Sequence, residues 1–117
     1  MFNILKAIFA THQVQDLEAD LYSPAYPQFR GEAELYASSN GRYTLEIELK
    51  HDNRTLSDTL ALHVDDTQVG YVPVQASGRS FRRTERDGPL GFDPEIGQTV
   101  QLWDQDTMVF EGTFVRD

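Results

Sequence analysis

The chain has 117 residues, of which 39% are hydrophobic and 25% are charged, a balance that is ordinary for one globular domain. It contains no cysteine, which excludes disulfide scaffolds, thiolate metal sites and cysteine nucleophiles and fits a reducing, cytoplasmic compartment. The formal net charge of −9 disfavours binding to nucleic acid or anionic membranes, and it favours either a cationic partner or plain solubility.

The first residues follow a helical period. Placed at 100° steps, the large apolar side chains fall within one arc of about 160°. They are Met1, Phe2, Ile4, Leu5, Ile8 and Phe9. A second set, Val14, Leu17 and Leu21, keeps the period on a different face, so we expect a bent helical arm over residues 1–23. The arm is too short to span a membrane, and no basic residue precedes its apolar run as in a signal peptide.

Prolines end the helical pattern, and residues 24–30 are expected to be a connector. From Gly31 onward the apolar residues recur at every second position, which predicts strands. The runs 33–37 and 43–49 flank Asn40-Gly41, a pair that favours a tight hairpin turn. Residues 31–50 therefore predict a β-hairpin with one apolar face and one acidic face.

Further alternating segments predict strands over residues 60–64, 68–75, 79–86, 99–103 and 108–115. Polar turns around Asp65-Asp66 and Asp104–Asp106 separate them, and residues 87–97 have the glycine and proline content of a loop. No segment of helical length lies between the strands, which disfavours a parallel sheet. The predicted fold is mainly β: a small antiparallel β-sandwich or barrel of about seven strands over residues 31–117, with an N-terminal helix.

Short segments of this β region have a common hairpin-like character. They are Gly31–Leu35, Leu60–Asp65 with Val69-Gly70, Gly97–Val100 and Glu111–Phe114. In these segments the chain resembles small uncharacterised β-sandwich domains found in bacterial proteins. The resemblance covers most of the β region and none of the arm, and it implies a fold without implying an activity.

Arginines cluster on the predicted strand 79–86. Arg79, Arg82, Arg83 and Arg86 are four of the ten basic residues, and strand alternation places Arg82, Thr84 and Arg86 on one face. Guanidinium groups bind phosphate or carboxylate, which makes the cluster a candidate anion-binding or partner-binding edge. The alternative is a charged edge strand that prevents pairing with other sheets.

No other group forms a recognisable site. The acidic turns lack the spacing of a calcium loop, and His12, His51 and His63 are not spaced as zinc ligands, so no metal site is predicted. The serines stand in no nucleophile pattern, and no catalytic residue is assigned. Trp103 is expected in the core or at an interface, with its indole N–H paired.

Taken together, these features favour a non-catalytic binding or assembly module. Its interface would be the apolar arm, through Phe2, Ile4, Leu5, Ile8 and Phe9, and the partner a second copy of the chain or another protein. Three alternatives stay open: a small-ligand carrier with a pocket inside the fold, a hydrolase with an unpatterned carboxylate or histidine site, and an inhibitor that mimics nucleic acid through its charge. No cofactor is expected.

Overall fold

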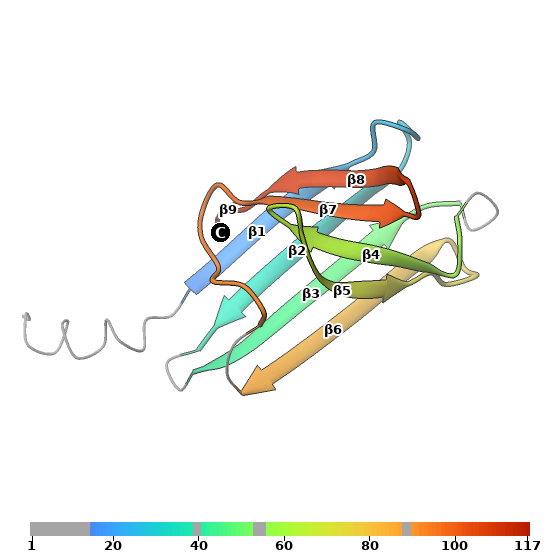
Figure 1. Ribbon diagram of the computed structural model, residues 1–117. Helices are drawn as coiled ribbons and strands as arrows, with labels where there is room; N and C mark the ends of the chain where they lie inside the picture. The colour runs from blue at the N-terminus through green and yellow to red at the C-terminus, as the bar shows by residue number, and fades with distance from the viewer. Residues whose placement is uncertain (1–14, 39–40, 53–55, 88–89) are drawn as a thin grey trace, which may run out of the picture.

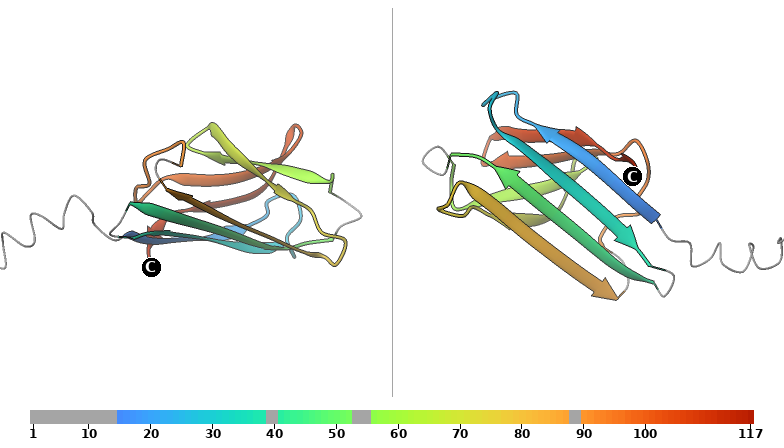
Figure 2. Two further views of the ribbon diagram at one scale, coloured as in Figure 1. Left: turned by 90° about the horizontal axis from the view of Figure 1, so that it is seen from below. Right: turned by 180° about the vertical axis from the view of Figure 1, so that it is seen from behind.

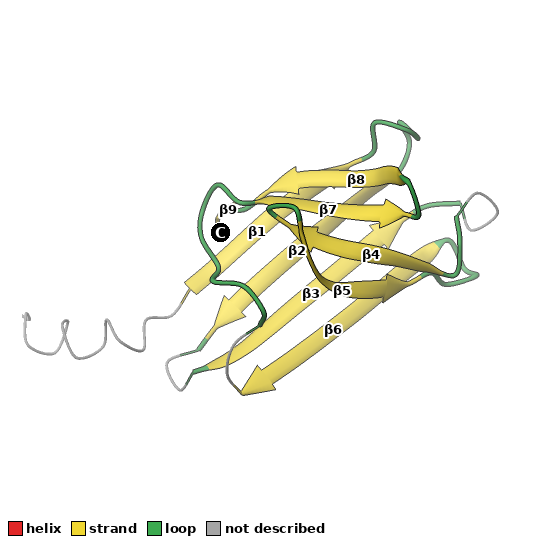
Figure 3. Cartoon of the chain, in the orientation of Figure 1, coloured by secondary structure: helices red, strands yellow, loops and turns green. Residues whose placement is uncertain are grey.

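The computed structural model describes residues 15–38, 41–52, 56–87 and 90–117, and these residues form strands and loops with no helix (Figures 1 and 3). The strands are β1 (Gln15–Tyr22), β2 (Arg30–Ala37), β3 (Arg42–Lys50), β4 (Thr59–Val64), β5 (Thr67–Pro73), β6 (Arg79–Asp87), β7 (Thr99–Asp104), β8 (Thr107–Thr113) and β9 (Val115–Arg116). Within the described ranges no helix is long and apolar enough to cross a membrane.

The strands form one antiparallel sheet that turns back on itself. Its order is β5-β4-β7-β8-β1-β2-β3-β6, with β9 paired to β1. Strands β1, β2, β3 and β6 make one layer, and β8, β7, β4 and β5 make the other (Figure 2). The layers are joined where Tyr22 of β1 pairs with Glu111 of β8. The end strands β5 and β6 lie side by side without ladder hydrogen bonds, so the sheet is a nearly closed barrel.

The core lies between the two layers and follows from strand alternation. On β3, Leu45, Ile47 and Leu49 are 7%, 1% and 0% exposed, while the acidic residues between them lie on the outer face. The opposite layer contributes an equivalent apolar row, Leu60, Leu62 and Val64 of β4. Burial of such side chains stabilises the fold by about 1.5–3 kcal/mol each. The predicted hairpin, with one apolar and one acidic face, is confirmed.

The helical prediction is wrong for residues 15–22, which form strand β1. Leu17 and Leu21 are four positions apart, a spacing that suits one helix face and also one strand face. Ala19 lies between them and is 0% exposed, and this period of two identifies the strand. The strand region therefore begins at Gln15 and not at Gly31. The rest of the predicted arm, including Phe2, Ile4, Leu5, Ile8 and Phe9, lies outside the described residues.

The junction between the layers requires a glycine. A Cβ atom at Gly112 of β8 would collide with the backbone oxygen of Asp20 on β1 and would lie 2.9 Å from Cδ2 of Leu21. Only a residue without a side chain lets the two backbones approach this closely. Gly112 therefore sets the position at which the sheet bends from one layer into the other.

Candidate functional site

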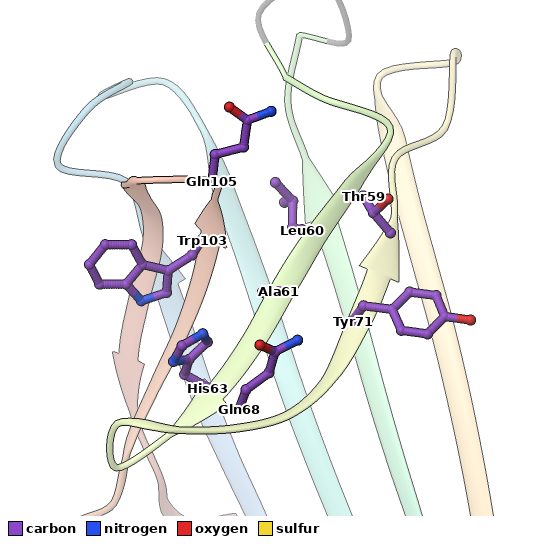
Figure 4. Close-up of a pocket in the computed structure, with 8 residues that line it drawn as sticks. All are labelled: Thr59, Leu60, Ala61, His63, Gln68, Tyr71, Trp103 and Gln105. Carbon is purple, nitrogen blue, oxygen red and sulfur yellow. The ribbon is translucent and has the colours of Figure 1, made fainter.

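A hollow with a volume of about 730 Å³ lies on the outer face of β4, β5 and β7. Figure 4 shows the side chains that line it. Strand β4 contributes Thr59, Leu60, Ala61 and His63, and β5 contributes Gln68 and Tyr71. Strand β7 contributes Trp103, and the turn that follows it contributes Gln105.

The hollow arises from one cross-strand row. Ala61 of the central strand β4 is paired with Trp103 of β7 on one side and with Tyr71 of β5 on the other. Neighbouring strands are about 4.8 Å apart, so the two aromatic residues start roughly 9.6 Å from each other. The small Ala61 leaves the floor between them unfilled. A methyl group flanked by two large aromatic residues thus produces a concave surface on the outer face of the sheet.

A chain of hydrogen bonds fixes the indole of Trp103. Its Nε1–H donates to Oε1 of Gln101 at 3.0 Å, and Nε2 of Gln101 donates to Oε2 of Glu111 at 2.7 Å. The Tyr22 hydroxyl donates to the other oxygen of Glu111 at 3.0 Å, and this hydrogen bond to a carboxylate raises the pKa of Tyr22. The imidazole of His63 lies beside the indole, with ring centroids 5.9 Å apart. The indole is therefore held in place before any ligand arrives.

The lining of the hollow carries no carboxylate, ammonium or guanidinium group. A quarter of the chain's residues are charged, so this neutral surface stands out from its surroundings. It offers two aromatic rings, an imidazole, the amides of Gln68 and Gln105 and the hydroxyl of Thr59. Amides and hydroxyls both donate and accept hydrogen bonds, and aromatic faces attract C–H groups. The site can bind a neutral ligand that has an apolar ring face and polar substituents.

The four arginines of the predicted anion site are divided between the two faces of β6. Arg82 and Arg86 line a cavity at the open edge between β5 and β6, as alternation predicts. Arg83 faces outward, where it lies 2.8 Å from Glu85 and 3.5 Å from Glu46. Arg79 shares this outward face and is exposed. The structure therefore brings together one pair of the cluster and not all four.

The outer face of β1, β2 and β3 is acidic. Glu18, Glu34 and Glu46 stand opposite one another in one row, and Asp20, Glu32 and Glu48 form the next. The charge of Asp117 raises the pKa of Glu18, and a side-chain hydrogen bond shared with Glu32 raises the pKa of Glu34. Like charges placed opposite each other destabilise a sheet. Carboxylates gathered on one face are compatible with a nucleic-acid mimic, and mimicry stays a prediction.

The histidines and acidic turns have structural roles where they are described. His51 Nε2 lies 2.6 Å from Oγ of Ser80, which is 0% exposed and also accepts a hydrogen bond from the backbone N–H of Gln75. Asp65 accepts a hydrogen bond from the backbone of Thr99, and Asp104 accepts one from the backbone of Ser57. Among the described residues no group of three or more His, Asp or Glu side chains could hold a metal ion. His12 lies outside them.

These features define an antiparallel β protein of nearly closed barrel form with a neutral, aromatic hollow on one outer face. No protein-family model matches the chain, and no curated protein matches its sequence significantly. The resemblance to bacterial β-sandwich domains stays a prediction.

Sequence reasoning did not predict the hollow. The alternation Thr99-Val100-Gln101-Leu102-Trp103 already placed Trp103 on the same polar face as Gln101, and this signal pointed away from the core. What the sequence does not show is the pairing that brings Ala61 between Trp103 and Tyr71. That arrangement depends on contacts between segments distant in the chain.

Proposed function

We propose that this protein is a non-catalytic binding module and that the neutral hollow on β4, β5 and β7 is its binding site. The observation that carries the proposal is the row Trp103–Ala61–Tyr71, in which two aromatic residues flank an unfilled floor within a lining free of charged groups. Concave sites lined by aromatic side chains and a few polar groups are the usual form of ligand sites in proteins.

The ligand class that fits this lining best is a neutral carbohydrate. A sugar ring presents C–H groups on its faces, which pack against the aromatic rings of Trp103 and Tyr71. Its hydroxyl groups donate and accept hydrogen bonds, as do the side-chain amides of Gln68 and Gln105. A phosphorylated or carboxylated ligand would find no cation in the lining to offset its charge.

The test uses the intrinsic fluorescence of Trp103, which is the chain's single tryptophan. Neutral oligosaccharides of varied composition are titrated into the full chain, and a saturable change in emission is the expected result. The variants Tyr71→Ala and Ala61→Leu, which remove one wall and fill the floor, should each weaken binding by about tenfold.

Tyr36→Ala is the matched control. Tyr36 is 46% exposed and Tyr71 is 50% exposed, but Tyr36 lies on β2 in the opposite layer. This variant should bind as the unmodified chain does. The proposal fails if no neutral saccharide changes the emission, or if Tyr36→Ala weakens binding as much as Tyr71→Ala. Saturation by a neutral proline-rich peptide in place of any saccharide would overturn the ligand class and keep the hollow as a binding site.

The other predicted functions have less support. Ser80, the serine beside His51, is 0% exposed, and the lining around His63 contains no carboxylate, so neither histidine offers a substrate an assembled catalytic group. Self-association through residues 1–10 stays a prediction from the sequence. The predicted small-ligand carrier has a candidate cavity, at the edge between β5 and β6.

A further inference from the structure

A second hollow lies inside the fold, at the open edge between β5 and β6. It is a partly enclosed cavity of about 120 Å³. Leu62, Leu90 and Phe92 form an apolar side, and Arg82, Thr84 and Arg86 of β6 form a polar side. No residue in this lining is acidic. The cavity thus has two guanidinium groups on one side and an apolar surface on the other.

The direction of Arg82 follows from the register of β6 on β3. Arg82 is paired with Ile47 and Thr84 with Leu45, and residues paired across antiparallel strands share a face of the sheet. Ile47 is 1% exposed and points into the core, so Arg82 is directed to the interior side as well. Its Nε donates to Oγ1 of Thr84 at 3.2 Å, and its Cζ lies 4.3 Å from the ring centroid of Tyr71.

The guanidinium of Arg82 has unused hydrogen-bonding capacity. It carries five N–H donors, and within the described residues its one hydrogen bond is the Nε contact with Thr84. Neither Arg82 nor Arg86 forms an ion pair with any residue that the structure describes, whereas Arg42 and Arg83 on the outside do. Arg86 is exposed and Arg82 is half-buried, so the guanidinium of Arg82 has lost part of its hydration without gaining an anionic partner, which costs free energy. An anion at the polar side of the cavity would supply that partner.

We propose that this cavity binds a small organic monocarboxylate with a short hydrocarbon chain. The carboxylate accepts paired hydrogen bonds from the terminal N–H groups of Arg82, with Arg86 beside it. The hydrocarbon chain packs against Leu62, Leu90 and Phe92. An inorganic anion would satisfy the arginines but leave this apolar side uncovered. The volume, equal to that of roughly four water molecules in the liquid, limits the ligand to a short chain.

The test is a calorimetric titration of the full chain with butanoate, compared with butanamide and with inorganic phosphate. Butanoate should bind saturably, and both comparison compounds should bind about tenfold more weakly or not at all. Arg82→Gln and Arg86→Gln should each weaken butanoate binding, Arg82→Gln by about tenfold. Arg79→Gln changes an arginine on the outward face of the same strand and should leave the affinity unchanged.

Amide chemical shifts of the unmodified chain give a second measurement, which does not depend on the folding of a variant. Butanoate should shift the signals of Leu62, Val72 and Phe92, which lie around the cavity. Equal affinity for butanamide, tighter binding of phosphate, or shifts confined to the outward face around Arg79 would each overturn the proposal. So would the absence of butanoate binding at millimolar concentrations. None of these results bears on carbohydrate binding at the outer hollow, which Trp103 fluorescence reports separately.

Discussion

The guanidinium of Arg82 lies over the ring of Tyr71, with its Cζ atom 4.3 Å from the ring centroid. Tyr71 lines both the neutral outer hollow and the arginine-lined inner cavity. One aromatic ring therefore separates the two candidate sites, and a cation of β6 contacts it across an edge where β5 and β6 share no ladder hydrogen bonds.

Replacing Tyr71 by leucine should destabilise the protein by about 0.5–1 kcal/mol, because the cation–π contact between Arg82 and this exposed ring is lost. Urea unfolding measures the change. In a double-mutant cycle with Arg82→Gln, the two losses should be less than additive, since both variants remove the same contact. Strictly additive losses would mean that the contact contributes nothing to stability. Tyr36→Leu, at an exposed tyrosine of the other layer, serves as the control.

Gly112→Ala should destabilise the protein by about 1–3 kcal/mol, because the new methyl group would collide with the Asp20 backbone and push β8 away from β1. Gly70→Ala is the matched control: Gly70 also lies in a strand, and its added Cβ would meet no atom within 4 Å. That variant should be neutral or slightly stabilising. Thermal melts of the two variants compare them directly, and equal melting temperatures would contradict the role given to Gly112.

Glu34→Gln should raise the melting temperature by about 1–4 °C at neutral pH, because it removes a carboxylate from the middle of an acidic row. Added salt should reduce the difference between variant and unmodified chain, since salt screens charges at exposed positions. Glu95→Gln, in the exposed loop before β7, removes one charge away from the acidic face and should change the melting temperature less. If both variants gain equally, net charge and not the row is responsible.

The acidic face and His51 should act on stability with opposite signs as the pH falls. A side-chain hydrogen bond shared with Glu32, followed by burial and the charges of neighbouring carboxylates, raises the pKa of Glu34 above 4.5. The folded state therefore takes up the proton first, and stability increases as the pH falls through that raised value. Burial lowers the pKa of His51 below 6.5, so the unfolded chain takes up the proton first. The contribution of His51 to the stability of the fold is complete above pH 6.5. It is lost as the pH falls through the lowered pKa that His51 has in the folded state.

His51→Gln isolates the second effect. Its melting temperature should fall less between pH 7.5 and 5.5 than that of the unmodified chain, because the variant has no imidazole to protonate at this position. Melts at these two pH values provide the measurement, and Glu34→Gln provides the control for the carboxylates. An unchanged pH dependence in His51→Gln would show that His51 contributes nothing in this range.

Deletion of residues 1–13 tests the predicted arm without removing β1, which begins at Gln15. If the apolar side chains from Phe2 to Phe9 mediate self-association, the deletion should convert a dimer to a monomer in light scattering after size exclusion. The melting temperature measured at high dilution should then change little. A monomeric full-length chain would rule out the arm as a dimer interface. Deleting residues 1–20 would be uninformative, because Leu17 and Ala19 belong to the core.

The sequence predicts the strands well wherever apolar residues alternate with charged ones. On β3 the residues between Leu45, Ile47 and Leu49 are charged, so a one-residue slip would bury a carboxylate, and one register is strongly preferred. The same rule places Arg82, Thr84 and Arg86 on one face of β6, as the structure shows. Strand β1 was missed because Leu17 and Leu21 fit both periods and a helical pattern precedes them.

The candidate site depends on contacts between distant segments, and for that reason it was harder to predict. Trp103 was expected in the core or at an interface, whereas it is partly exposed and its indole N–H is bonded to Gln101 on the outer face. Its place in a hollow follows from the pairing of β7 with β4 and of β4 with β5. Alternation assigns a side to each residue, but it does not tell which residue of another strand will stand opposite.

The unpaired edge between β5 and β6 also determines which backbone amides exchange with solvent first. Backbone groups on the facing edges of these strands have no ladder partner, so water reaches them without any opening of the fold. Their amide protons should exchange with solvent well before those of β2 and β3, which are paired with a strand on each side. Transient separation of β5 from β6 would give a small molecule a route to the interior while the other strands stay paired.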